Sequence, residues 1–153
     1  MKNIFDIEQR ALIEKRIQLL TVESQPLWGK MDIYQMLIHC RRWSDWIHGK
    51  GEFERHTYKQ DFLGKLFGKM ALKNTIKNDR VMGKNLPAGL LTIKDKQSYD
   101  ISIEKARWIQ SVKEYEDFGN ERFIHDFFGK MTKEQIGIFV YKHFDHHLRQ
   151  FGV

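Results

Sequence analysis

The sequence predicts an all-α protein, and three observations support this class. Apolar residues recur at helical spacing in five segments. Only two prolines occur, Pro26 and Pro87, and each falls in a connection between these segments. One connection, residues 78–100, is long and polar, whereas antiparallel neighbouring helices need only short links. We therefore expect a helical bundle with a long crossover, formed by a single domain over residues 1–153, because this length suits one domain.

Caps and apolar spacing predict the position of each helix. The expected helices cover about residues 6–20, 32–47, 58–77, 102–115 and 132–150. In the fourth, Ile103, Ala106 and Ile109, with Ile101 or Ser102, lie on one side, which we expect to be the buried side. Within the 78–100 connection, Leu90–Ile93 predicts a short extended piece.

A Gly-Lys-Met sequence occurs three times, as "WGKM" at 28–31, "LFGKM" at 66–70 and "FFGKM" at 127–131. The glycines lie 39 residues (29 to 68) and 61 residues (68 to 129) apart, and a solenoid needs a fixed period. The chain is therefore not a repeat array.

The first and third copies each precede a helix-capping signature. Asp32 with Gln35, and Thr132 with Gln135, combine an N-cap side chain with a glutamine three residues later that can bond back to the cap. The middle copy has no such cap, so we expect it inside a helix. The first and third copies mark the starts of two helices.

Composition limits the function classes. Lys and Arg outnumber Asp and Glu by 26 to 20, a net charge of +6 that favours an acidic partner. The basic residues are spread along the chain, so we expect no nucleic-acid partner. The single cysteine and the polar N-terminus predict a cytoplasmic protein. No run of 18 apolar residues occurs, so we expect no transmembrane helix and no membrane partner.

Two histidines lie on the apolar face of the last expected helix. His143 and His147 are four residues apart, which stacks their rings one turn from each other and lets two imidazoles bind one cation. Without a cation, a buried pair loses hydration and needs hydrogen-bond partners. The alternative is a pair of core histidines bonded to backbone or water. The pattern leaves both alternatives open.

His39 is the third candidate ligand. It follows its cap Asp32 by seven residues, while the other two histidines follow Thr132 by eleven and fifteen. At about 100° per residue, all three project to nearly the same side of their helices relative to the helix starts. His39 also lies at the edge of its own apolar stripe, so a histidine at the solvent boundary is the alternative.

The remaining candidates carry weaker signals. Cys40 could serve as a thiolate ligand or nucleophile, but its position in the apolar stripe favours a small core residue. His146 could support a ligand or lie at the surface. No spacing links the other histidines to a ligand set, and we expect them in surface or loop positions: His48, His56 and His125.

The segments "WGKMDIYQMLIHC" and "FFGKMTKEQIGIFVYKHFDHHLRQFG" resemble the DinB/YfiT-like superfamily, and within it a subfamily of unassigned function. The resemblance extends over almost the whole chain. It implies a four-helix bundle with an up-down-down-up course, often dimeric, that holds a divalent metal through three histidines. By position, His39, His143 and His147 match these ligands. Gln150 matches a polar residue that often follows the histidine pair.

The resemblance also implies a class of reaction. Characterised relatives include metal-dependent thiol transferases and a thiol-dependent isomerase. We therefore expect a divalent ion, zinc or nickel, a low-molecular-weight thiol, an electrophilic small molecule and a homodimer. Residues 146–150 read His-His-Leu-Arg-Gln where relatives tend to read His-His-Arg-Gly-Gln, which keeps the ligands and changes the substrate surroundings.

Trp43 and Trp46 are expected to line the acceptor pocket of the transferase, although aromatic residues at this spacing also form cores.

Two further functions compete with the transferase. Hydrolysis by metal-activated water would need a base, and no glutamate adjoins the histidines as in H-E-x-x-H. The alternative outside catalysis is a dimeric helical-bundle interaction or structural protein.

Overall fold

The computed structural model describes residues 1–84, 91, 93 and 100–153. This part of the chain contains no strand, so the predicted all-α class is confirmed within it. None of its helices combines the length and apolar character needed to cross a membrane. The helices are α1 (Ile7–Leu19), α2 (Ile33–His48), α3 (Phe62–Ile76), α4 (Ile101–Lys113) and α5 (Lys133–Gln150), with two short 3-10 helices, η1 (Gly51–Phe53) and η3 (Glu114–Asp117).

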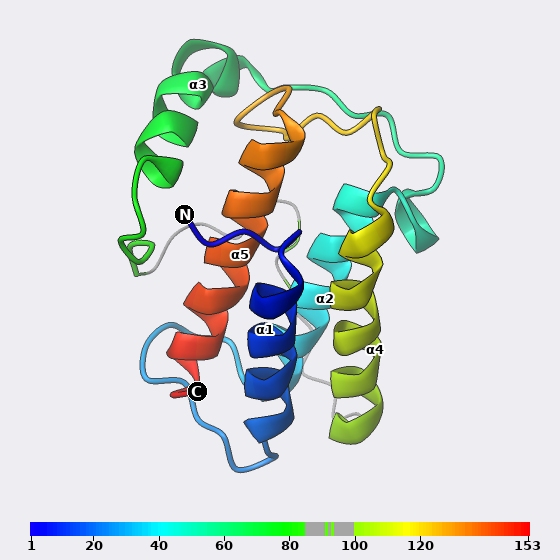
Figure 1. Ribbon diagram of the computed structural model, residues 1–153, viewed down its shortest axis with the longest axis vertical. Helices are drawn as coiled ribbons and strands as arrows, with labels where there is room; N and C mark the ends of the chain where they lie inside the picture. The colour runs from blue at the N-terminus through cyan, green and yellow to red at the C-terminus, as the bar shows by residue number, and fades with distance from the viewer. Residues whose placement is uncertain (85–90, 92, 94–99) are drawn as a thin grey trace.

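Four helices lie side by side along the long axis of the molecule (Figure 1). Each packs against two of the others: α1 against α4 and α5, and α2 against α4 and α5. In Figure 1, α1 and α5 run in one direction and α2 and α4 run in the opposite one. The fifth helix, α3, lies outside this group and contacts α5.

The capping signatures act as predicted. Both α2 and α5 begin with a complete capping box, from Asp32 with Gln35 and from Thr132 with Gln135. The middle Gly-Lys-Met copy lies inside α3, as expected. That helix begins later than predicted because the side chain of Asp61 caps it. The predicted extended piece includes residues 90 and 92, which lie outside the described residues.

The predicted buried face of α4 is right only in part, because Ile101 and Ile109 pack partly buried against the core but Ile103 does not. Ile103 is 50% exposed, whereas Trp108 and Val112 are fully buried. The indole of Trp108 meets the ring of Phe144 edge-on, with centroids 5.4 Å apart. Burying this large aromatic stabilises the fold more than burying an isoleucine would, so the tryptophan sets the rotation of the helix.

The last helix is buried on nearly all sides. Tyr141, on the side of the helix away from the apolar face of the histidine pair, is 3% exposed because the N-terminal segment covers it. The backbone N–H of Ile4 donates to the carbonyl of Gly137, and the ammonium of Lys2 lies 5.6 Å from the centre of the Tyr141 ring. The amphipathic pattern thus located the inner face of α5 but not the cover on its outer face.

Two glycines allow α3 to lie close to the segment that precedes α5 in the sequence. Gly64 and Gly68 are buried, and a Cβ atom on either would overlap the carbonyl oxygen of Phe127. Because the obstacle is backbone, neither a rotamer change nor a side-chain shift can relieve it. The pair of glycines therefore sets the position of α3.

We predict that Gly68→Ala lowers the free energy of unfolding. Alanine is favoured over glycine within a helix by about 1 kcal/mol, but overpacking against a backbone atom costs about 1–3 kcal/mol, so we expect a net loss of up to about 2 kcal/mol. Urea denaturation followed by circular dichroism measures it. Gly119→Ala is the control, since its nearest neighbouring atom would be 3.8 Å away. A more stable Gly68→Ala protein would contradict the close approach.

Candidate metal centre

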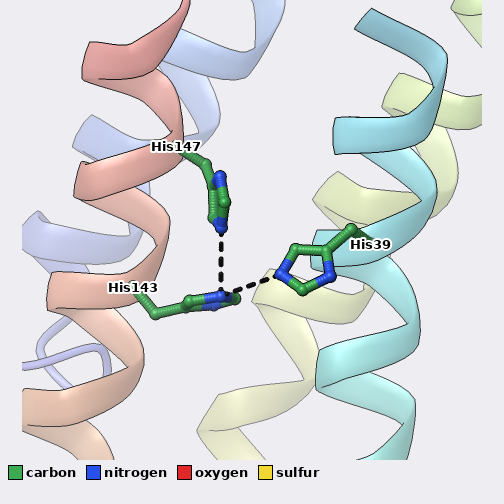
Figure 2. Close-up of side chains that lie close together, drawn as sticks. All are labelled: His39, His143 and His147. Carbon is green, nitrogen blue, oxygen red and sulfur yellow. Dashed lines mark hydrogen bonds between the residues drawn. The ribbon is translucent and has the colours of Figure 1, made fainter. Parts of the chain in front are cut away.

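Three histidine side chains meet between α2 and α5 (Figure 2). The Nε2 atom of His143 lies 3.1 Å from Nε2 of His39 and 3.2 Å from Nε2 of His147. All three residues are buried, and their ring nitrogens lie close enough to bind one metal ion. The structure therefore brings together the three residues that the sequence singled out.

The structure decides against a boundary position for His39. The residue is 2% exposed, and its ring meets those of His143 and His147 edge-on, with centroids 5.2 and 4.9 Å apart. Helices α2 and α5 begin at their capping boxes, and their packing turns the relevant positions towards each other.

Outer hydrogen bonds fix two of the rings. The Nδ1 atom of His39 donates to the carbonyl of Leu91 over 3.0 Å. The Nδ1 atom of His147 donates to Oε1 of Gln150 over 2.9 Å, and Nε2 of this glutamine donates to the carbonyl of Trp28 over 2.7 Å. Since Nδ1 carries the proton in both rings, each Nε2 presents a lone pair to the centre of the cluster.

The centre of the cluster lacks protons for its lone pairs. A proton on Nε2 of His143 can satisfy one neighbouring Nε2 but not both in good geometry. One cation would satisfy all three nitrogens. At zinc–nitrogen distances of about 2.0–2.1 Å, tetrahedral geometry separates ligand nitrogens by about 3.3 Å, close to the 3.1 and 3.2 Å observed. The residues therefore fit a divalent metal ion.

His143 differs from the other two histidines in its surroundings. Its Nδ1 atom is buried and has no hydrogen-bond partner among the described residues. The ring instead lies against the indole of Trp43, with centroids 4.2 Å apart and an interplanar angle of 30°. Packing, and not a hydrogen bond, thus orients the central ring.

The two tryptophans expected to line an acceptor pocket pack against other aromatic rings. Trp43 and Trp46 pack against each other and around His125, which lies 5.2 Å from Trp46 between ring centroids. Three surface hollows lie on the described part of the chain, and other residues line them. None of the three therefore opens on to His39, His143 or His147.

Burial keeps the cluster neutral near pH 7. Loss of hydration lowers the pKa of His143 well below the usual 6.5, with further lowering by the adjacent His147 and His39. The same cause lowers the pKa of His147 to about 3 and lowers that of His39. Neutral imidazole is the form that binds metals, so these shifts favour metal binding.

Cys40 and His146, the two candidates next to the histidines in sequence, do not belong to the cluster. Cys40 is fully buried, with Sγ 3.8 Å from the sulfur of Met36, and burial raises the pKa of its thiol well above the ordinary value. It is a core residue and a poor nucleophile. His146 is buried, not at the surface, and its ring centroid lies 5.8 Å from that of Trp28 and 5.1 Å from that of His147.

Sequence reasoning missed the carbonyl groups that hold the outer nitrogens. Every residue carries a carbonyl, so no pattern distinguishes those of Leu91 and Trp28. Gly29 offers a partial signal, because its φ is +82° and a Cβ there would overlap the amide nitrogen of Gln150. The "WGKM" stretch thus supports the histidine cluster as well as preceding a helix.

The family model described as "Protein of unknown function (DUF1569)" matches residues 15–152. The chain belongs to this family. All three clustered histidines, Trp28 and Gln150 lie within the matched residues. The chain has no match among the curated proteins and none among the solved structures.

We predict that acid destabilises the metal-stripped protein partly through His147. An unfolded histidine takes up a proton near pH 6.5, while folded His147 does so only near pH 3. Between these values the unfolded state binds more protons, so the free energy of unfolding falls as pH is lowered, by up to about 1.4 kcal/mol per pH unit for this residue.

Urea denaturation in the presence of a chelator, from about pH 6 to about pH 4, measures this slope. His147→Gln should show a shallower slope than the wild type. Equal slopes for His147→Gln and the wild type would contradict a neutral, buried His147.

Proposed function

We propose that the protein is a divalent-metal-binding member of the DinB/YfiT-like superfamily, with zinc or nickel held by His39, His143 and His147. The observation that carries this proposal is the convergence of three buried Nε2 atoms, two of which present lone pairs fixed by outer hydrogen bonds. The proposal includes one domain over residues 1–153 and the up-down-down-up four-helix course. The helix directions and packing pairs support that course (Figure 1).

We further propose that the site serves a metal-dependent transferase that adds a small thiol to an electrophilic small molecule. Three neutral ligands leave a bound divalent ion with its full charge, and such an ion acidifies a thiol or water that reaches it. The buried Cys40 cannot supply the thiol, which supports a thiol from solution. No glutamate adjoins the histidines in the sequence as in H-E-x-x-H, which disfavours base-assisted hydrolysis.

Burial favours a second candidate, a metal that holds the helices together in a non-catalytic, dimeric interaction protein. None of the three histidines is more than 8% exposed. A structural metal site is closed, whereas a catalytic one keeps an open position. Metal binding energy would then be folding energy.

The metal-binding proposal predicts one divalent ion per chain. Titration of the metal-stripped protein with zinc or nickel, followed by elemental analysis, measures stoichiometry and affinity. His39→Ala, His143→Ala and His147→Ala should each abolish or strongly weaken binding. Gln150→Leu should weaken binding about tenfold to a hundredfold, because it removes the acceptor that orients a ligand ring.

His56→Ala is the matched control, because this histidine lies outside the cluster, and it should bind like the wild type. Circular dichroism establishes that each variant is folded. Unchanged affinity in His39→Ala would refute a three-histidine site.

Catalysis predicts thiol-dependent loss of an electrophile. Wild-type protein with bound metal should consume a chlorinated or epoxide acceptor only when a low-molecular-weight thiol is present, and His39→Ala should not. Thermal denaturation with and without chelator separates the two candidates. No turnover with any thiol, together with a large fall in melting temperature on metal removal, would replace the transferase with the structural role.

A further inference from the structure

The outer face of α3 exposes a continuous apolar surface. Its large side chains occur at positions i, i+1, i+4, i+5 and i+8, which occupy one side of a helix turning about 100° per residue. They are 50–74% exposed: Phe62, Leu63, Leu66, Phe67 and Met70. The opposite side carries the two buried glycines, together with Leu72 and Ile76.

This surface is not explained by the proposed metal centre. Helix α3 lies at the outside of the molecule and contacts α5 (Figure 1). Its glycine side lies against the backbone of Phe127. Single exposed apolar residues are normal on a protein, but a contiguous patch of five marks a binding surface.

The charges around the patch indicate the kind of partner. Between residues 59 and 77 the chain carries five lysines and one aspartate, a net charge of +4 (5 − 1). All the lysines are exposed: Lys59, Lys65, Lys69, Lys73 and Lys77. Lys65, Lys69 and Lys73 lie within α3 at intervals of four residues. They therefore form a basic row along one edge of the apolar face.

We propose that this face of α3 binds the surface of an anionic lipid bilayer. An apolar helix face with phenylalanine and leucine, bordered by lysines, can lie in the interfacial plane with its apolar side among the acyl chains and its ammonium groups at the lipid phosphates. A second copy of the chain fits less well, because it would bring another +4 to the same contact.

Peripheral binding is compatible with the finding that no helix among the described residues is long and apolar enough to span a membrane. The expectation of no membrane partner rested on the lack of a long apolar run, and an interfacial helix needs only one apolar face. Helix α3 is 15 residues long and already folded against the protein. The helix therefore does not have to order at the bilayer, which removes an entropic cost of binding.

Co-sedimentation with lipid vesicles tests the proposal. The wild-type protein should bind vesicles of equal parts phosphatidylcholine and phosphatidylglycerol, and should bind pure phosphatidylcholine far more weakly. Replacing Lys65, Lys69 and Lys73 by glutamine should weaken binding to the anionic vesicles roughly a hundredfold, since each lysine near an anionic surface contributes about a factor of five.

Leu66→Gln with Phe67→Gln should weaken binding by about a hundredfold, because two apolar side chains no longer enter the bilayer. The matched control is Leu12→Gln with Ile103→Gln, two exposed apolar residues on other helices, which should bind like the wild type. Circular dichroism verifies that every variant keeps its helices.

Equal binding of the wild type to both kinds of vesicle, or to neither, would overturn the proposal. A second result would also overturn it: the wild type is a dimer that binds no vesicles, and Leu66→Gln with Phe67→Gln makes it a monomer. The patch would then be an interface between two copies of the chain. Analytical ultracentrifugation distinguishes this outcome. Metal content does not enter the assay, so failure here leaves the metal-binding proposal unaffected.

Discussion

The burial of three imidazole rings between α2 and α5 is the constraint on which the rest of the site depends. A buried imidazole loses hydration, and a charged one loses far more, so the cluster must stay neutral and its nitrogens must find partners. The carbonyl of Leu91 and the amide of Gln150 satisfy two outer nitrogens. The inner Nε2 of His143 lies about one ligand–ligand spacing from that of His39 and from that of His147. A bound cation would remove the shortage of protons at the centre.

The surrounding structure holds this arrangement in place through segments far apart in the sequence. Gln150 links the end of α5 to the carbonyl of Trp28, in the segment before α2. The long connection between α3 and α4 reaches the site through Leu91, so it contributes to the ligand environment as well as joining two helices. The indole of Trp43 packs on the central ring. Each ligand therefore has a different means of orientation.

The molecule has two separate regions of unusual composition. The histidine cluster is buried and polar, whereas the outer face of α3 is exposed and apolar. These depart in opposite directions from the usual rule for residue burial. The glycines of α3 connect the second region to the fold, because they let the helix lie directly on the backbone near Phe127 and turn its large side chains outward.

Sequence patterns predicted the features that depend on local geometry. Capping boxes located the starts of α2 and α5, and the four-residue interval placed His143 and His147 on one face. The resemblance added His39, which periodicity left at the edge of its stripe. Local rules were sufficient for these features because caps and helical periodicity involve residues only a few positions apart.

Packing between distant segments determines which helix faces are covered and which groups complete the site. The apolar spacing of α4 predicted Ile103 inside, yet packing of Trp108 on Phe144 turned it outward. Tyr141 became buried because the N-terminal segment lies over α5. The carbonyl of Leu91 reaches His39 across 52 residues of sequence. These outcomes depend on contacts between distant segments, and no local pattern records which segments will meet.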